Sequence, residues 1–373
     1  MVLRAWAADH RAPIPAVSAA LARAAADPAA LTDADAVTLL GADGDHLDRL
    51  CALADAARRE RIGADTLTFV VNRNLDTGVV TALPATGDVS VADLVREAVA
   101  AGATEICLQG PLPADAPADG YLRVVDQIAA AAEVHLHAFR APEIADAAAR
   151  MGIGIAEFLT RARAAGLGSV PGTAAQILDD EVRAALAPGG AAPPVGAWVD
   201  VITAAHAAGL FSTATMVYGH VETPAHQVAH LRLLTRIQQR TQGFSELILM
   251  PMVASNTPPH LRGRPTVSVR ETRAVHAVAR LLTLGHLDHL QVAWTKFDAA
   301  TVDALLTGGV DDIGGLLLDG TLLPDAGAEA GRVLDPATLL GFADRAGRTL
   351  VQRTTSYARP PADRLLPLDR VPG

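Results

Sequence analysis

The feature that most constrains the fold is an alternation that begins at Thr66. Short apolar runs of strand length are followed by longer, Ala-rich stretches with helical periodicity. This pattern is typical of parallel sheets whose strands are connected by helices. The runs cover residues 66–72, 105–110, 134–139, 168–172, 212–219, 246–253, 290–297 and 311–318.

Eight such units over about 250 residues are typical of a closed barrel, in which strands are buried on both faces. An open doubly wound sheet is the alternative, but NRNLDTG after the first run is not a G-x-G-x-x-G phosphate loop. The predicted fold class is therefore α/β, a (β/α)8 TIM-type barrel with an N-terminal helical cap and an extended C-terminal tail. We expect the cap at residues 1–62, the barrel at 63–357 and the tail at 358–373.

Local signals support the predicted helices. Thr32 can cap a helix with Asp35 three residues later, and Ser90 can do the same with Asp93. Two further stretches, 144–152 and 230–243, end at glycine, which favours a helix terminus.

Charge and hydropathy limit the classes of partner. The chain has a formal charge of -10, so it lacks the basic excess that attracts phosphate backbones. No stretch has the length and apolarity of a signal sequence or a bilayer span. We therefore expect a cytoplasmic protein that binds a small molecule rather than nucleic acid or membrane.

Polar residues gather where the predicted strands end, and the carboxyl ends of barrel strands carry active sites. Four of them could transfer protons in catalysis: His137, Glu143, His220 and Glu222. Nine could bind substrate: Asn72, Arg73, Gln109, Arg140, Thr173, Gln176, Tyr218, Trp294 and Asp311.

Several of these residues have a second interpretation. His135 and His137 share one face of a strand and, with His220, could bind zinc or iron, although hydrogen-bonded pocket histidines are the more ordinary case, and no metal is assigned. Glu143 and Glu222 could equally be capping or Arg-paired carboxylates. Trp294 could stack on a heterocycle or fill the core.

Six segments in order resemble one family. They are HAFRAPE (137–143), PGTAAQIL (171–178), TATMVYGHVET (213–223), HLRLLTRIQQRTQGFSE (230–246), DDIGG (311–315) and QRTTSY (352–357). They look like the radical-SAM enzymes of deazaflavin cofactor synthesis, above all the FO synthase subunit that joins a tyrosine-derived fragment to a ribityl-aminouracil. The aminofutalosine synthases are related to these.

The resemblance implies a four-iron cluster held by a Cys-x-x-x-Cys-x-x-Cys loop after the first strand. This chain continues there as LDTGVVTALPATGDVS, and Cys51 and Cys107 are its only cysteines. A site-differentiated cluster takes three thiolates. We therefore expect the iron-sulfur cluster to be absent and no cofactor to be bound, with S-adenosylmethionine not expected to bind.

Three positions depart from the family pattern: Gln176 stands where glutamate is usual, Arg140 where serine is, and Asp311 where asparagine is. The other ten candidate site residues match it. One hypothesis is a cluster-free enzyme, transferase- or lyase-like, that performs acid-base chemistry on an aromatic or amino-acid-derived molecule. Alternatives are a pseudoenzyme that partners an active radical-SAM homologue or self-associates, and the family's own 4-hydroxyphenyl transferase activity.

Overall fold

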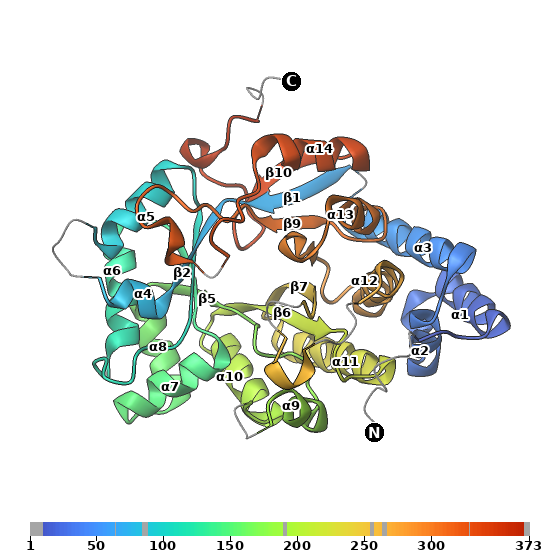
Figure 1. Cartoon of the computed structure of the whole chain (residues 1–373), viewed down its shortest axis with the longest axis horizontal. Helices are drawn as coiled ribbons and strands as arrows, with labels where there is room; N and C mark the ends of the chain where they lie inside the picture. Colours follow the sequence, from blue (N-terminus) through green and yellow to red (C-terminus); the bar gives the residue numbers. More distant parts are fainter. Residues whose placement is uncertain are drawn as a thin grey trace.

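The computed structural model describes residues 10–63, 65–83, 89–188, 192–253, 257–262, 267–327 and 329–368. In this part of the chain ten strands form one sheet, and every strand pair is parallel (Figure 1). The strands are β1 (Thr66–Val70), β2 (Asn72–Asp76), β3 (Glu105–Gln109), β4 (His135–Ala138), β5 (Leu167–Val170), β6 (Phe211–Tyr218), β7 (Phe244–Pro251), β8 (Leu290–Val292), β9 (Asp312–Gly315) and β10 (Thr349–Arg353).

The sheet curls because β1 and β2, which are nearly continuous in the chain, pair with strands on opposite sides of the sheet. β1 pairs with β9 and β10, whereas β2 pairs with β3, and only Val71 separates β1 from β2. The remaining strands follow in the order β9, β8, β7, β6, β5, β4 and β3. The predicted TIM-like α/β barrel is thus confirmed, with β10 added beside β1 at the seam.

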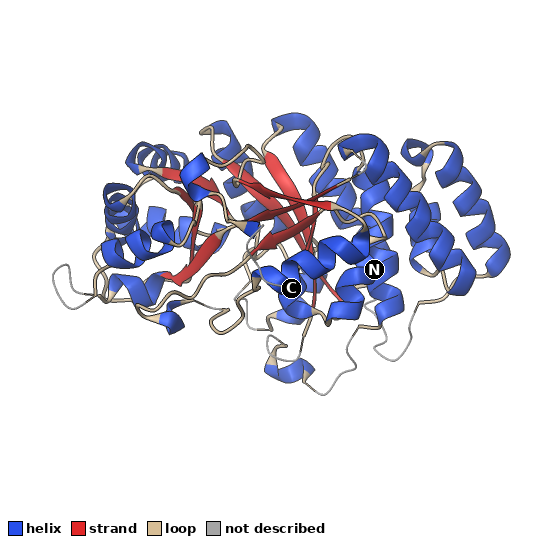
Figure 2. Ribbon diagram, turned by 90° about the horizontal axis from the view of Figure 1, so that it is seen from above, coloured by secondary structure: helices blue, strands red, loops and turns tan. Residues whose placement is uncertain are grey.

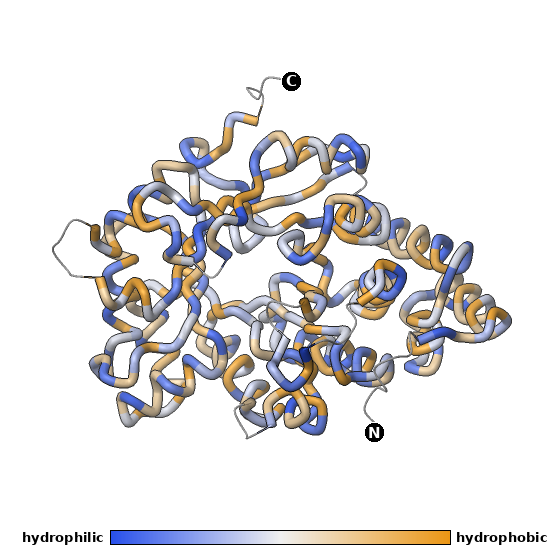
Figure 3. The backbone as a smooth tube through the Cα atoms, in the orientation of Figure 1, coloured by the Kyte–Doolittle hydropathy of each residue, from blue (hydrophilic) through white to orange (hydrophobic). Residues whose placement is uncertain are grey.

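Helices surround the strands, as Figure 2 shows from above. Those that follow β2 are α4 (Thr77–Thr81), α5 (Val91–Ala100), α6 (Gly120–Ala131), α7 (Ala141–Met151), α8 (Ile155–Ala165), α9 (Asp180–Leu186), α10 (Val195–Ala207), α11 (Pro224–Thr241), α12 (Val269–Thr283), α13 (Ala299–Leu306) and α14 (Pro336–Ala346). Short 3-10 turns lie at η3 (Pro259–Leu261), η4 (Trp294–Lys296), η5 (Pro324–Ala326) and η6 (Ala362–Arg364). Along these helices hydrophobic and hydrophilic residues alternate, which is the pattern of a helix with one buried face (Figure 3).

The predicted helix signals are largely confirmed. Ser90 and Asp93 form a capping box at the start of α5, and α7 ends at Gly152, whose φ is 65°. The helix expected to end at Gly243 ends earlier, because Gln242 adopts the left-handed conformation with φ 51°.

The N-terminal helices stack on the outside of the barrel. They are α1 (Ile14–Ala26), α2 (Asp33–Leu40) and α3 (Gly44–Ile62), with the 3-10 turn η1 (Pro28–Ala30), and Figure 1 shows them beside α11 and α12. Thr32 and Asp35 form the predicted capping box of α2. The break between α2 and α3 is fixed from α12, where Arg270 donates to the carbonyls of Leu40 and Ala42.

The C-terminal segment runs across the seam of the barrel. Gln352 on β10 donates to the carbonyl of Arg364, and Arg364 donates to the carbonyl of Ala103. The last part of the predicted tail, residues 369–373, lies outside the described residues. Among the helices of the described ranges, none has the length and apolarity to cross a bilayer.

Candidate functional site

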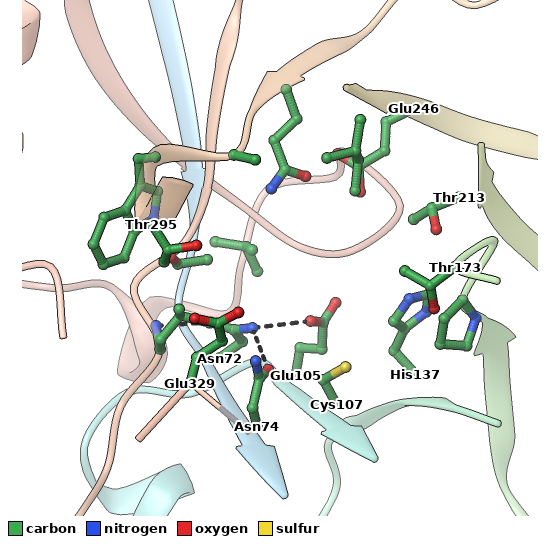
Figure 4. A pocket seen from close by; sticks show the side chains of 18 of the residues that line it. Asn72, Asn74, Glu105, Cys107, His137, Thr173, Thr213, Glu246, Thr295 and Glu329 are labelled. Carbon is green, nitrogen blue, oxygen red and sulfur yellow. Dashed lines mark hydrogen bonds between the residues drawn. The ribbon is translucent and has the colours of Figure 1, made fainter. Parts of the chain in front are cut away.

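A cavity of about 190 Å³ opens at the carboxyl ends of the strands. Its polar lining comes from β2, β3, β4, β6, β7, β8 and β10 and from the segments after β5, β8, β9 and β10, and Figure 4 shows several of these residues around the cavity. Five predicted site residues line it: Asn72, Gln109, His137, Thr173 and Trp294. Further polar lining residues are Asn74, Glu105, Thr213, Glu246, Gln291, Thr295, Lys296, Glu329, Arg353 and Thr355.

One wall of the cavity carries two amides and a carboxylate. Asn72 Nδ2 donates to Asn74 Oδ1 at 3.2 Å and to Glu105 Oε1 at 3.4 Å (Figure 4). Asn72 Oδ1 accepts the backbone N–H of Leu317, a residue held at φ 58°. Non-glycine residues in this conformation store backbone strain and collect at functional sites. The wall is therefore a fixed surface with amide and carboxylate groups for a polar ligand.

His137 lies two strands along from Asn74, because Cys107 on β3 pairs with both residues. Its Nδ1 is 2.6 Å from the hydroxyl of Ser169, which also contacts His135 Nε2 at 2.7 Å. Burial, with a smaller contribution from the charge of Arg353, lowers the pKa of His137 to about 3. The imidazole is therefore neutral near pH 7, and its Nε2 has no hydrogen-bond partner in the described ranges.

The rim contains the stacking candidate. Trp294 donates its indole N–H to the carbonyl of Gly315 at 3.0 Å, so the ring has a fixed orientation while it remains half-buried beside the cavity. Next to it, Lys296 Nζ is 2.5 Å from Glu329 Oε1. An aromatic face and a charged pair thus border the opening.

The floor is a buried ionic cluster. Arg353 donates to both oxygens of Asp312 and to Glu246 Oε2, which also accepts the Tyr357 hydroxyl at 2.7 Å. Burial raises the pKa of Glu246 to about 7, and the charges of Asp312 and Glu105 act in the same direction, against the opposing effects of Arg353 and Tyr357. A carboxyl group that exchanges its proton near neutral pH therefore faces the cavity.

Two predicted site residues outside the cavity lining hold a loop instead. Glu143 Oε1 accepts the backbone N–H of Gly110, and Oε2 accepts that of Arg140 at 2.8 Å. The Arg140 guanidinium also pairs with Glu143. These contacts match the capping and Arg-paired alternative, and a proton-transfer role for Glu143 stays a prediction.

His220, Glu222 and Tyr218 lie at the end of β6, and none of the three is exposed. Glu222 accepts the backbone N–H groups of Gly219 and His220, and Tyr218 donates to Thr272. Burial raises the pKa of Glu222, but His220 and these N–H groups outweigh it, so the net shift is downward. The three residues stabilise the turn after β6, outside the cavity lining.

Arg73, Gln176 and Asp311 also lie outside the lining. Arg73 is tied to Glu97 and to the carbonyl of Leu322, and Gln176 is strained at φ 50° with an unpartnered buried Oε1. Asp311 precedes β9 at its amino end, opposite the mouth, where it pairs with the buried Arg280. Substrate contacts by these residues remain untested predictions.

Sequence reasoning missed the residues of the floor. Glu246, Ile248 and Met250 alternate along β7, so a glutamate opening an apolar strand was the available signal for an inward-facing carboxylate. Glu105 alternates with Cys107 and Gln109 on β3 in the same way. Arg353 had no such signal, because β10 was not predicted as a strand.

The three histidines of the metal alternative are engaged by other groups of the chain. His135 and His137 share Ser169, whereas His220 contacts the Val217 carbonyl and Glu222. In the described ranges no three or more His, Cys, Asp or Glu residues are grouped in a way that could hold a metal ion.

Comparison with known proteins gives close relatives, although no family model matches the chain. The FO synthase of Mycobacterium leprae is 43% identical over 361 residues, which are 92% of this chain and 42% of that protein. The FO synthase of Streptomyces coelicolor is 40% identical over 368 residues, again 42% of its length. The chain thus spans less than half the length of the FO synthases that it matches.

Two solved structures share the fold at 14% sequence identity. HydG, a maturase of the [FeFe]-hydrogenase, has a TM-score of 0.67. The match covers 93% of this chain and 78% of the HydG chain. Methylornithine synthase has a TM-score of 0.62, with 90% of this chain and 97% of that structure covered. At this identity the likeness concerns the fold alone.

The relatives overturn one prediction. We expected no iron-sulfur cluster, no bound cofactor and no S-adenosylmethionine, and this is wrong, because the chain matches a family to which the sequence resemblance assigns both. The number of cysteines limits how many thiolate ligands this chain can supply, but it does not determine which cofactor the protein binds.

The residues present nevertheless do not fit a three-thiolate site. Cys51 and Cys107 are the only cysteines, and both are buried. Cys107 lines the cavity, where burial raises the pKa of its thiol to about 12 and Gln109 donates to its sulfur.

A relative from an archaeon matches over nearly its whole length. The 5-amino-6-(D-ribitylamino)uracil–L-tyrosine 4-hydroxyphenyl transferase of Archaeoglobus fulgidus is 35% identical over 327 residues, which are 82% of this chain and 92% of that protein. The chain therefore belongs to the radical-SAM family of this transferase and of FO synthase.

Proposed function

We propose that this protein is a biosynthetic enzyme whose cavity binds an aromatic or amino-acid-derived small molecule. The observation that carries the proposal is the cavity at the carboxyl ends of the strands, with fixed amides on β2 and a neutral histidine on β4 in its lining. The printed name of the archaeal relative supplies the ligand class, a ribityl-aminouracil and L-tyrosine. The reaction class proposed is 4-hydroxyphenyl transfer, with acid-base steps made by residues of this chain.

The cavity offers complementary groups for a pyrimidine. The Asn74 amide can donate to a ligand, and each of the two amide oxygens, which accepts one hydrogen bond within the protein, has a second lone pair; such groups suit the alternating N–H and C=O groups of a uracil edge. Trp294 gives a fixed aromatic face on which such a ring can stack.

His137 is the residue proposed to move a proton. Its Nδ1 is engaged by Ser169, so its free Nε2 can accept a proton from a bound ligand when the ring is neutral. The low pKa, caused mainly by burial, keeps the base form dominant at neutral pH.

The test is calorimetric titration of the protein with 5-amino-6-(D-ribitylamino)uracil and, separately, with L-tyrosine. We expect saturable binding of at least one ligand, and Asn72→Ala should weaken the binding of the uracil by about tenfold through loss of about 1–1.5 kcal/mol of hydrogen bonding. Arg232→Gln, on the outer helix α11, is the matched control and should bind as the parent does. Absence of binding by either ligand contradicts the proposal.

A partner-dependent role is the second candidate, and the length comparison favours it. The match covers 42% of each FO synthase, so more than half of each of those proteins lies outside the matched region. We propose that a separate radical-SAM homologue supplies the remaining activity. Co-expression of the two should raise product formation above that of either protein, and an unchanged yield would contradict this role.

A further inference from the structure

Buried carboxylates outnumber buried cations at the cavity floor. Glu105, Glu246 and Asp312 are each no more than 6% exposed. In the described ranges Arg353 is the cation paired with Glu246 and Asp312, and Glu105 has no cation within ion-pair distance. Because an uncompensated buried charge is costly, this cluster favours a cation supplied from the cavity.

Two carboxylate oxygens are available to a ligand. Glu246 Oε2 accepts from Arg353 and Tyr357, whereas its Oε1 has no hydrogen-bond partner among the described residues. Glu105 Oε2 accepts the Thr355 hydroxyl at 2.7 Å, and the amide of Asn72 is 3.4 Å from Oε1. Both side chains line the same cavity (Figure 4).

We propose that Glu246 and Glu105 bind a primary ammonium group of the ligand, with Arg353 and Tyr357 positioning Glu246. An ammonium has three donors and no acceptor, so it matches oxygens that accept only. Arg353 and Tyr357 hold Oε2 and thereby turn Oε1 toward the cavity. This inference rests on the proposed function and narrows its ligand class to aliphatic amines, such as amino acids.

The environment of Glu246 supports this assignment. The groups that face it are Arg353 on β10, Asp312 on β9, Tyr357 after β10 and Glu105 on β3. Burial and the two other carboxylates raise its pKa to about 7, so part of the population is protonated at neutral pH. An ammonium favours the ionised form, and amine binding should therefore release protons to the buffer.

The experiment compares tyramine, L-tyrosine and 3-(4-hydroxyphenyl)propionate by calorimetry at pH 7. Tyramine and the propionate share the phenol ring and its two-carbon arm, but tyramine ends in an ammonium and the propionate in a carboxylate. Tyramine should therefore bind at least about thirtyfold more tightly, because the carboxylates of Glu246 and Glu105 attract the cation and repel the anion. Titration in two buffers of different ionisation enthalpy measures the protons released.

Substitutions test whether Glu246 causes the preference for tyramine and the release of protons. Glu246→Gln keeps the size of the side chain and should remove both the preference for tyramine and the proton release. Tyr357→Phe keeps the carboxylate but deletes a donor that lowers its pKa, so proton release should increase at pH 7–8. Glu157→Gln, an exposed residue of α8 paired with Arg161, is the matched control and should leave both values unchanged.

Equal affinities for tyramine and the propionate within threefold, or no binding of tyramine at 5 mM, would overturn the inference. So would an unchanged amine preference in a Glu246→Gln protein that unfolds at the parent temperature. Titration with 5-amino-6-(D-ribitylamino)uracil separates the two proposals, because its binding without any amine preference leaves the proposed function standing while this inference fails.

Discussion

Substitution of Asp311 can show whether its carboxylate stabilises the fold or contacts the substrate. Its carboxylate is 1% exposed and pairs with Arg280, which has no exposed side-chain surface, and it accepts the backbone N–H of Leu290 at 2.7 Å. His289 Nδ1 lies 2.8 Å from its second oxygen. Asp311→Asn leaves Arg280 buried without its counter-charge, and breaking such a pair costs about 3–5 kcal/mol.

This loss of stability lowers the melting temperature by an amount that depends on the unfolding entropy. A chain of 373 residues has an unfolding entropy of roughly 0.8 kcal/mol/K, taking about 2.1 cal/mol/K for each residue. Asp311→Asn should therefore lower the Tm by about 4–6 °C in differential scanning calorimetry. Asp33→Asn is the matched control, because its ion pair with Arg232 is largely exposed, and such pairs contribute at most about 1 kcal/mol.

The effect should also depend on pH. Burial raises the pKa of Asp311, but Arg280 and His289 outweigh it, so the folded-state pKa lies below the ordinary value. The carboxylate therefore contributes stability that is present above its unfolded pKa and is lost as the pH falls through the folded pKa. The Tm difference between parent and variant should shrink below about pH 4. An Asp311→Asn protein with the parent Tm at pH 7 but without ligand binding would refute this reasoning and favour a substrate contact.

Three further outcomes are expected. Because the folded-state pKa of His137 is about 3 and its unfolded pKa is about 6.5, the unfolded state binds a proton first as the pH falls, and the fold loses stability below about pH 6.5. His137→Asn removes this effect. It should reduce the pH slope of the unfolding free energy between pH 6.5 and 5 by up to about 1.4 kcal/mol per pH unit, measured by urea denaturation. Trp294→Ala should weaken ribityl-aminouracil binding by about 0.5–1.5 kcal/mol, whereas Trp294→Phe should retain most of the affinity, and equal loss in both would argue against stacking. Glu143→Ala should destabilise the fold by about 1–3 kcal/mol, because the N–H of Gly110 loses its acceptor, and a parent-like Tm with lost turnover would instead support proton transfer by Glu143.

The fold was largely predictable because its signals are local. Buried parallel strands appear as apolar runs, and all eight predicted runs contain a strand. Capping boxes such as Ser90 with Asp93 depend on residues three positions apart, so they too can be seen in the sequence. β10 was missed because TLVQR is short and partly exposed, and its place is set by pairing with β1, more than 280 residues earlier.

The candidate site was only partly predictable. Asn72 and His137 lie where strand ends were expected, and both line the cavity. Glu246 and Arg353 meet across 107 residues, and no local pattern encodes that contact. Asp311 was assigned to the mouth although it opens the predicted run 311–318, and the structure places it one residue before β9, at the amino end of that strand.

The bend at Val71 has a consequence for how the protein assembles. Since β1 and β2 serve opposite sides of the seam, β10 pairs with β1 there, and β10 and β2 are the two edges of the sheet. Arg353 lies on β10, and Thr355 and Tyr357 follow it, so the floor of the cavity forms only after residues up to Tyr357 have been synthesised. A ligand that occupies the floor therefore reports that β10 has paired with β1, more than 280 residues earlier in the sequence.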